Sequence, residues 1–528
     1  MELPVNQWIV SLNNLLQLVG TMAKYKPRNS GQKVFIPVFL EDQIMPGTLE
    51  FVIHTLIEDR MDMSIFDGRY KNDETGRHAY DPKILLKIVL LAYSRGMASS
   101  RPIERACREN VTFMALADCE QPDHSTIAEF VSSMKDEIRS LYTDVLLVCE
   151  EEDLLGGTFF ALDGCQLSSN ASARWSGKIS DIKKKKDKIE AKVRGLIETQ
   201  IQADRNDAGD ASAARSLDRS NRAKQVARLQ KKAEQIGEWL KDNDAKIGRQ
   251  GREIKSNVTD NESALLFGSH GTVQGYNGQA LVDDKNQVIV HAEVFGDGQD
   301  HHHVPPMIDG AKENMKALGH DEGYFEETVL TADALYHSAA SIAKCEEEKI
   351  DAYIPDKLFR KRNPDLKPKR RYNEKKTQRI HLEAFHHREA DDVYLCPKGK
   401  VLRLKARNVM SSHDRICNIY AAGADDCTGC EFKAKCISRK DGKRRYLTVR
   451  TETVLGNRNK AMADKIDTEE GRRKYNRRFA IIEPVFGNIR SQKRLNRFTL
   501  RGKIKVNIQW LLYCMVHNME KIANYGLI

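Results

Sequence analysis

The sequence predicts a mixed α/β protein that combines an all-α N-terminal region, one sheet flanked by helices, an inserted helical hairpin and a cysteine-rich module. Three observations lead to this fold class. Apolar helical patterns fill the first 150 residues, strand and helix patterns alternate from residue 157 to 355, and a highly charged stretch interrupts them. We expect four parts, at residues 1–150, 151–355, 356–460 and 461–528.

Composition limits the class of protein. The 528 residues are enough for about two to four domains, and the net charge of +10 suits an acidic partner such as nucleic acid. Eleven cysteines are too few for a disulfide scaffold, so reduced thiols are expected. The sequence contains no run of about 18 apolar residues, and its first residues lack a basic n-region. We therefore expect a soluble protein without a signal peptide.

The first 150 residues contain three short helix patterns. Asp81 and Pro82 form an N-cap and first-turn pair before the apolar run KILLKIVLLAY, which Gly96 ends. A second helix is expected after Ser99 and a third near Ser125. Short helices joined by tight turns are typical of helix-turn-helix DNA-binding domains, and a plain helical bundle is the alternative.

Residues 178–256 are highly charged and almost free of proline and aromatic residues. Apolar residues recur there at spacings of three and four, which is the pattern of a coiled-coil seam. They are Ile182, Ile189, Val193 and Leu196 in the first half, and Val226, Leu229, Ala233, Ile236 and Leu240 in the second. The small residues of RNDAGDASAARS indicate a turn between the halves. We expect an antiparallel helical hairpin inserted after the first strand, with its charge on a solvated face rather than in a DNA-binding stripe.

The alternating elements begin with the apolar strand GTFFALDG, and the strands GQALVDD and QVIVHAEVF follow as a hairpin. A helix, a strand, a second helix and a last strand come next, at VPPMIDGAKENMKAL, TVLTADAL, SAASIAKCEEEK and DAYIP. This order suits one sheet with helices on its faces. The apolar stretch KVNIQWLLYCMVHNMEKI is expected to form a helix that docks on that sheet.

Residues 357–379 interrupt the alternation with eleven Lys or Arg against two acids. A segment of this composition cannot build a core, so we interpret it as flexible and in contact with phosphates. A merely solvated linker is the alternative. The HHH run at 301–303 also invites a metal-site interpretation, but its place between a loop and a helix favours a turn without ligands.

The cysteine-rich stretch contains one CxxC motif, Cys427 to Cys430. Thiolates at this spacing in a reducing compartment favour a structural tetrahedral zinc site over unliganded thiols. The expected ligands are Cys396, Cys427, Cys430 and Cys436, and either Cys417 or His413 is an alternative for one of them.

Three carboxylates carry the candidate chemistry. Asp163 ends the first strand, Asp333 ends the strand TVLTAD, and Glu483 stands alone in the basic stretch RRFAIIEPVFGNIR. Clustered carboxylates repel one another, so they stay ionised together when a metal neutralises them. Hard oxygen ligands in an open site select Mg²⁺ or Mn²⁺, and a pair of such ions promotes phosphodiester cleavage and transfer. The sequence therefore predicts a metal site at these acids.

Pro484 indicates that Glu483 stands at the start of a helix, where the positive end of the dipole favours its ionised form. At about 100° per residue, Arg490 and Arg494 fall on nearly the same helix face as Glu483. Two guanidiniums along that face are expected to hold DNA phosphates. The alternative is a lone Glu in the first turn of an ordinary basic helix.

These blocks resemble the bacterial insertion-sequence transposases of the DDE type. FFALDGCQ, VLTADALYHS and RRFAIIEPVFGNIRSQKRLNRFTLRG are similar to the three blocks that carry the acids of that family, and they occur in the same order. YDPKILLKIVLLAYSRGMASSRPIERACREN resembles the N-terminal helical domain of these transposases, and GYNGQALVD resembles a stretch between their first two acids. The resemblance covers most of the chain and is weakest in residues 178–256.

The resemblance implies a ribonuclease H-like catalytic domain in which Asp163, Asp333 and Glu483 are the catalytic ligands of Mg²⁺ or Mn²⁺. Its first part would occupy residues 151–355, and residues 461–528 would supply the helices that carry the Glu. Residues 1–150 would bind DNA.

The third block of the family also has a Tyr and an Arg before the Glu and a Lys after it. Here Tyr475 and Arg478 fit the first two, each about one residue farther from the Glu than the commonest spacing, and Arg490 stands in place of the Lys. The resemblance thus implies DNA-binding roles for Tyr475, Arg478 and Arg490.

Together the sequence predicts a transposase that cleaves the ends of a mobile element and joins the freed 3′-hydroxyls to target DNA. The expected partners are the element ends and the target DNA, with no membrane, and action on two ends implies at least a homodimer. The expected location is the cytoplasm, at the nucleoid. The alternatives are a ribonuclease H-like nuclease without joining activity, and a DNA-binding regulator or inactive transposase relic.

Overall fold

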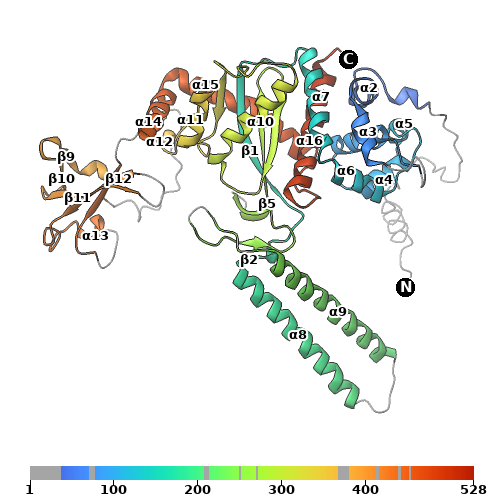
Figure 1. Cartoon of the computed structure of the whole chain (residues 1–528), viewed down its shortest axis with the longest axis horizontal. Helices are drawn as coiled ribbons and strands as arrows, with labels where there is room; N and C mark the ends of the chain where they lie inside the picture. Colours follow the sequence, from blue (N-terminus) through green and yellow to red (C-terminus); the bar gives the residue numbers. More distant parts are fainter. Residues whose placement is uncertain are drawn as a thin grey trace, which may run out of the picture.

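The computed structural model describes residues 37, 39–70, 78–206, 213–248, 251–268, 271–364, 366, 380–410, 416–437, 442–450 and 454–527. Most of the predicted basic segment 357–379 lies outside these residues, as do His413 and the centre of the predicted hairpin turn. Figure 1 shows a central sheet with its helices, a long helical hairpin that projects from it, and smaller parts on either side. Among the described helices, none is long and apolar enough to cross a membrane.

The N-terminal region is helical, as the sequence predicts. Asp81 accepts a hydrogen bond from the backbone N–H of Lys83 at 2.8 Å, and Pro82 is the first residue of its helix. Gly96 follows the helix with a φ of +74°, a conformation that favours glycine. The helices are α2 (Leu49–Thr55), α3 (Pro82–Ser94), α4 (Ser100–Glu109), α5 (Val111–Leu116), α6 (His124–Ser133) and α7 (Glu137–Glu151).

The central sheet is mixed, which confirms the predicted α/β class. Its strands are β1 (Phe159–Ser168), β4 (Ala264–Gly268), β5 (Gly271–Asp283), β6 (Ile289–Phe295), β7 (Val329–Ala332) and β8 (Asp351–Tyr353). β1 lies in the middle, antiparallel to β5 on one side and parallel to β7 on the other. β6 and β4 pair with the far edge of β5, and β8 pairs parallel to β7.

Helices cover both faces of this sheet. They are α10 (Val304–Ala317), α11 (Ala339–Glu347), α12 (Phe359–Arg362), α14 (Val454–Asp467), α15 (Glu469–Gly487) and α16 (Lys503–Tyr525). Gly278 of β5 lies so close to Trp510 of α16 that an added Cβ would stand 3.1 Å from the indole ring. Because successive strand residues point to opposite faces, Gln279 faces the other side, toward the segment that leads into α10.

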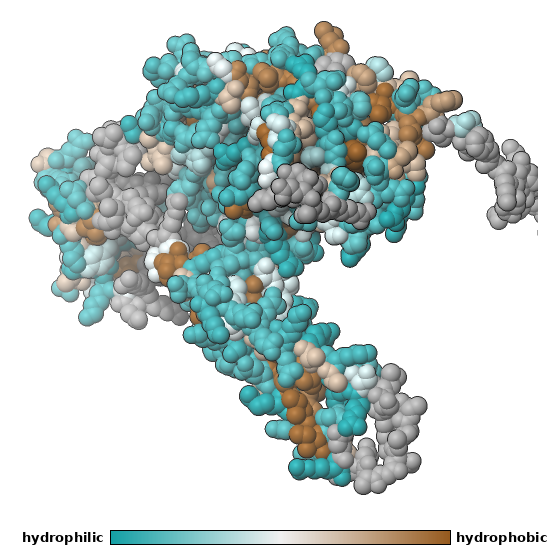
Figure 2. Space-filling view, turned by 45° about the vertical axis from the view of Figure 1, so that its right-hand side comes forward, coloured by the Kyte–Doolittle hydropathy of each residue, from teal (hydrophilic) through white to brown (hydrophobic). Residues whose placement is uncertain are grey.

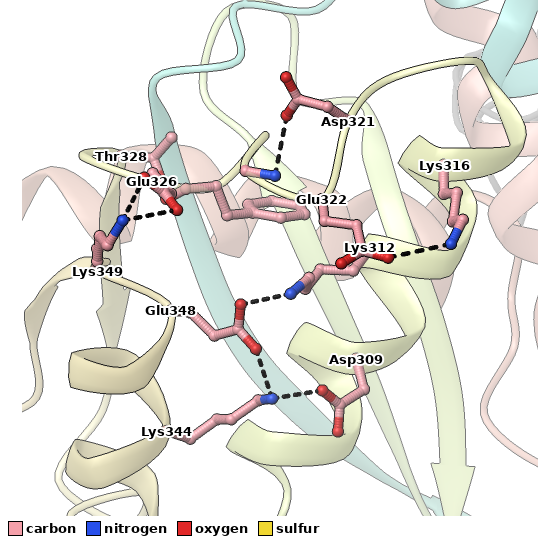
Figure 3. A network of polar contacts seen from close by, with 12 residues as sticks. Asp309, Lys312, Lys316, Asp321, Glu322, Glu326, Thr328, Lys344, Glu348 and Lys349 are labelled. Atoms are coloured by element: carbon pink, nitrogen blue, oxygen red, sulfur yellow. Dashed lines mark hydrogen bonds and ion pairs between the residues drawn. The ribbon is translucent and has the colours of Figure 1, made fainter.

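Ion pairs join α10 to α11 on the outer side of the sheet. Figure 3 shows Glu348 between Lys312 of α10 and Lys344 of α11, with Lys344 also paired to Asp309. These side chains are partly exposed, so the pairs add modestly to stability.

One hydrophobic core extends from the N-terminal helices to the sheet, and α16 lies at its centre. Tyr513 of α16 stacks on Tyr93 of α3 with ring centroids 4.5 Å apart. On the sheet side, Asn518 pairs with both backbone groups of Ile289 in β6, each at 2.9 Å. Tyr142 of α7 donates to the Ile289 carbonyl at 2.6 Å. The N-terminal helices and the sheet therefore share a core.

The predicted hairpin is present as α8 (Ile179–Asn206) and α9 (Ala213–Asp242), inserted after β1. Two short strands, β2 (Ser176–Gly177) and β3 (Ser256–Asn257), pair at its base, next to a core of Ile182, Ile236 and Val258. Val193 and Ala233 are also buried along the predicted seam. Figure 2 shows hydrophobic side chains along one side of the hairpin.

The cysteine-rich region contains a second antiparallel sheet, separate from the central one. Its elements are β9 (His386–Arg388), β10 (Val393–Leu395), β11 (Val401–Met410), β12 (Ile416–Ala422), α13 (Lys433–Cys436) and β13 (Tyr446–Arg450). Figure 1 shows this sheet on the opposite side of the central sheet from the N-terminal helices.

Candidate active site

Asp163 and Asp333 stand side by side where two parallel strands separate. The last register pair between β1 and β7 is Leu162 with Ala332, so the two acids are the next residues on each strand. Paired residues of parallel strands point to the same face, which brings both carboxyl groups to the side covered by α15. Asp163 does not end its strand, contrary to the sequence prediction, because β1 continues to Ser168 in its pairing with β5.

A buried arginine from α15 neutralises Asp163. Nη1 of Arg478 lies 2.6 Å from Oδ2 of Asp163, and the arginine side chain is only 7% exposed. The guanidinium also lies over the ring of Phe479, 4.7 Å from its centroid, and near the buried Tyr475. Arg478 and Tyr475, which the resemblance assigns to DNA, thus face the acids in this structure.

Both aspartates carry an electrostatic penalty. Burial raises the pKa of Asp163, although Arg478 and the backbone N–H of Gly164 act in the opposite direction. Burial and the neighbouring charge of Asp163 raise the pKa of Asp333 to about 6. Two neighbouring carboxyl groups whose pKa values are raised by burial form a site where a bound cation is favourable.

Glu483 does not begin a helix, so the sequence prediction is wrong on this point. α15 begins fourteen residues earlier, at Glu469, where the Thr468 hydroxyl accepts a hydrogen bond from the Gly471 N–H at 3.0 Å. Pro484 therefore lies within the last turns of the helix, and the helix dipole does not favour an anion at Glu483.

The helix tolerates Pro484 because a side chain replaces the hydrogen bond that proline lacks. A residue at position 484 with an N–H group would donate to the carbonyl of Ala480, and proline has no such donor. The side-chain amide of Gln287, in the turn between β5 and β6, donates to that carbonyl at 3.0 Å. The turn of the strand hairpin thereby fixes the end of α15 that carries Glu483.

Glu483 lies on an exposed side of α15. It follows Arg478 by five residues and therefore stands about 140° around the helix from it. In the described part of the chain Glu483 makes no hydrogen bond or ion pair, so the structure brings together Asp163 and Asp333 but not the third acid. No three described His, Cys, Asp or Glu side chains stand close enough together to hold a metal ion.

Arg490 and Arg494 do not continue the face of Glu483 as predicted. A π-helical turn, η9 (Asn488–Gln492), follows α15, and Arg494 has a left-handed φ of +55°. The wider turn and the chain reversal change the spacing of the faces. Arg490 is exposed, and its charge acts on Cys165 of β1, whose pKa burial raises to about 12. Arg494 packs its side chain against Gly96.

A buried polar network supports the acids from the other face of the sheet, and its members were not predicted from the sequence. Asp300 accepts hydrogen bonds from Asn277 at 2.6 Å and from Gln279 at 3.0 Å. Tyr336, in the turn after Asp333, donates to the side-chain oxygen of Gln279. Asn277 and Gln279 lie within GYNGQALVD, the stretch that resembles the transposase family between its first two acids. That position was the one feature of the sequence that could have indicated their role.

Gly164 allows this network to lie against β1. A Cβ atom at position 164 would stand 2.1 Å from Nε2 of Gln279 and 2.8 Å from Oδ1 of Asn277, so both amides would have to move away from Asp300. Glycine directly after Asp163 therefore lets the amides reach the back of the strand at the acid.

The HHH run lies at the end of the same network. His302 ends the short 3-10 helix η5 (Asp300–His302), and His303 precedes α10. Nε2 of His303 lies 2.9 Å from Oδ1 of Asp297, and its ring stacks on Phe295 at 4.0 Å between centroids. Burial alone would lower the pKa of His303, but the neighbouring carboxylates of Asp297 and Asp300 raise it. His303 thus has a packing and charge-pairing role at this junction.

Comparison with known families adds to this geometry. A model described as "Transposase DDE domain" matches residues 395–523, and one described as "Transposase domain (DUF772)" matches residues 38–133. Over these two segments the chain is similar to DDE-type transposases. This confirms the resemblance found in the sequence. The transposase DDE match includes α15 and Glu483 but begins after both Asp163 and Asp333. No curated protein and no solved structure was found that matches this transposase-like chain.

Proposed function

We propose that this protein is a DDE transposase that cleaves the ends of an insertion sequence and joins the freed 3′-hydroxyls to target DNA. The observation that carries the proposal is the pair of Asp163 and Asp333 on adjacent parallel strands beneath α15. Without the short strand β4, the strands lie in the order β6-β5-β1-β7-β8. Numbered along the chain, this is the order third, second, first, fourth, fifth, which supports a ribonuclease H-like sheet. Transposase-domain matches in both halves of the chain support the same function.

The two aspartates fit a hard divalent cation such as Mg²⁺ or Mn²⁺. Each pKa is raised by burial, and the charge of Asp163 adds to the effect on Asp333, so a nearby positive charge would be favourable. We assign Asp163 and Asp333 as ligands, and Glu483 as the third ligand once it is brought to them. When bound, the ion would activate a water or a 3′-hydroxyl and stabilise the leaving oxygen of the phosphodiester.

Arg478 then has two positions in the proposed reaction. Against Asp163 it holds the carboxylate in place and compensates its negative charge. Once released from Asp163, its guanidinium can bind a DNA phosphate, for which its planar fork is suited. Arg490 is exposed and acts electrostatically on Cys165 of β1, which supports its assignment to the same DNA strand.

Cleavage of a labelled end duplex tests the three acids. The duplex is taken from inverted repeats that flank the coding region, and Mg²⁺ is added at constant ionic strength. Asp163→Asn, Asp333→Asn and Glu483→Gln should each lower cleavage by several orders of magnitude, while binding to the duplex stays near that of the unaltered protein. Double variants should be little worse than single ones, because the acids act together.

Asp351→Asn is the matched control, because Asp351 lies on β8 beside β7 and pairs with Lys465 and Lys474 instead of facing the two acids. It should retain cleavage. A Glu483→Gln protein that cleaves within about threefold of the unaltered protein would remove Glu483 from the proposal.

Strand transfer separates the transposase from a simple nuclease. A pre-cleaved duplex with a free 3′-hydroxyl should be joined to a plasmid in the presence of Mg²⁺, and release of short fragments without joined products would indicate a nuclease. A protein that binds the end duplex but neither cleaves nor joins it would indicate a regulator or relic. Gel filtration of the protein with the duplex tests the proposed dimer.

A further inference from the structure

The cysteine-rich region is a small folded unit with little apolar core. Among the described residues its buried hydrophobic cluster consists of Phe385, Leu402, Tyr420, Ala422 and Leu447. The cluster is separate from the core that the central sheet shares with the N-terminal helices. A unit with so little buried apolar surface normally requires a crosslink, either a disulfide or a metal ion.

Four cysteines lie around one pocket at the edge of this small sheet. Cys396 follows β10, Cys427 and Cys430 lie in the segment between β12 and β13, and Cys436 ends α13. All four line one cavity of about 490 Å³, and Cys396, Cys427 and Cys436 also pack against the small core. Residues that are up to forty positions apart in the chain therefore line one pocket.

Each of the two segments that carry the first three cysteines is a tight turn with a left-handed glycine. In Cys396-Pro-Lys-Gly399 the Gly399 N–H donates to the Cys396 carbonyl at 2.7 Å, and Gly399 has a φ of +73°. In Cys427-Thr-Gly-Cys430 the residue directly before the second cysteine, Gly429, has a φ of +70°. Glycine adopts this conformation without steric cost, so both chain reversals are built into the sequence.

The thiols also interact electrostatically with one another. The Cys436 thiol lies within electrostatic range of Cys427, Cys396 and Cys430, and of Arg445. Arg445 also donates a hydrogen bond to the Cys436 carbonyl. Four thiolates and one Zn²⁺ together carry two excess negative charges. The guanidinium of Arg445 stands where it would offset part of that charge.

We propose that Cys396, Cys427, Cys430 and Cys436 bind one structural Zn²⁺, with Arg445 as a positioning residue beside them. Four protein ligands complete the tetrahedral shell of zinc and leave no open position for a substrate, so the site stabilises the fold and takes no part in DNA cleavage. As they stand, no three described side chains are close enough to hold an ion. The thiols must therefore turn into the cavity that they line, to Zn–S distances of about 2.3 Å.

The same geometry excludes Cys417 as a ligand. Cys417 lies near the start of β12, in register with Val409 and Arg450. Ala422, at the other end of that strand, lines the cavity. Five residues of strand separate the two positions by roughly 16 Å, which is beyond the reach of a cysteine side chain. Cys417 is buried within the same small sheet and is therefore a matched control.

The experiment measures metal directly. Full-length protein, purified under reducing conditions without chelators or a histidine tag, is analysed for zinc by mass spectrometry. Metal-depleted protein is then titrated with Co²⁺, whose absorption spectrum reports thiolate ligands and tetrahedral geometry. We expect about one zinc per chain and a Co²⁺ spectrum typical of four thiolates, displaced by an equivalent of Zn²⁺.

Single Cys→Ser variants at positions 396, 427, 430 and 436 should lose the four-thiolate spectrum, whereas Cys417→Ser should retain it. Arg445→Met should bind zinc at least tenfold more weakly, and Arg445→Lys should restore part of that loss. Absence of a thiolate–Co²⁺ signal in the reduced unaltered protein would overturn the proposal, even where the variants fail to fold. Its persistence in a Cys427→Ser protein would also overturn it. None of these readouts depends on DNA cleavage, so the zinc site and the transposase function are tested separately.

Discussion

Replacing Asp333 with Asn should stabilise the protein at neutral pH. Asn keeps the side-chain oxygen that accepts the Leu335 N–H at 2.7 Å, and it removes the charge that Asp163 repels. The carboxyl titrates at a pH of about 6 in the folded chain, against 3.8 for the unperturbed group. Below pH 3.8 it is protonated in both states, and above about 6 the folded state carries the full penalty of the charge.

The magnitude follows from this shift. A rise from 3.8 to about 6 corresponds to about 3 kcal/mol, at 1.36 kcal/mol per pH unit. Asp333 is partly exposed, so we expect a gain of about 1–3 kcal/mol in the free energy of unfolding at pH 7.5. The gain should fall toward zero at pH 4, because the wild-type carboxyl is then largely protonated and resembles Asn.

Urea unfolding with EDTA present, followed by circular dichroism at pH 4, 6 and 7.5, measures the difference. Asp351→Asn should change in the opposite direction. Burial alone would raise the pKa of Asp351, but hydrogen bonds from Lys465 and Lys474 lower it, so its charge stabilises the fold above pH 3.8 and that stability is lost as the pH falls. An Asp333→Asn protein that is less stable than the unaltered protein at pH 7.5, or whose gain is the same at pH 4, would refute the reasoning.

Two further predictions concern hydrogen bonds around the site. Gln287→Ala should lower the free energy of unfolding by about 1 kcal/mol, because the Ala480 carbonyl loses its donor, and the loss should shrink in a Pro484→Ala background where the backbone supplies one. A loss that is equal in both backgrounds, measured by urea unfolding, would contradict this role. Tyr336→Phe leaves the buried oxygen of Gln279 without its donor and should cost about 1–3 kcal/mol, with reduced end cleavage and unchanged DNA binding. Unchanged unfolding and cleavage would show that the network does not position Asp333.

The sequence was sufficient where local chemistry decides the structure. Asp81 and Pro82 begin α3 because the cap and the first turn involve neighbouring residues only. The apolar seam that includes Ile182 and Ile236 likewise predicted the α8–α9 hairpin. Apolar residues spaced by three and four positions lie on one face of a helix, and two such faces pack together. The proximity of Asp163 to Asp333 was also predictable, because each acid directly follows an apolar run that the sequence assigns to the same sheet.

The errors came from contacts between distant residues. Pro484 normally marks a helix start, but Gln287, almost two hundred positions earlier, supplies the missing donor and lets α15 continue through it. Asp163 was expected at a strand end because the apolar run before it ends there. In the structure, however, β1 stays paired with β5 as far as Ser168. The network of Asp300 and Gln279 was missed since lone amides in a strand carry no periodic signal.

The position of α16 has a consequence for the order of events during synthesis. Helices α3 and α7 bury their apolar faces against a helix that is translated roughly 350 residues after α7 ends, which takes about 20–70 s at 5–20 residues per second. Until then a nascent chain exposes the groove that α16 will fill, and its first helices lack their final neighbours. An N-terminal fragment would retain that exposed groove permanently. If these helices bind DNA, as the family resemblance implies, their DNA-binding surface would become competent only when α16 has been made and has docked.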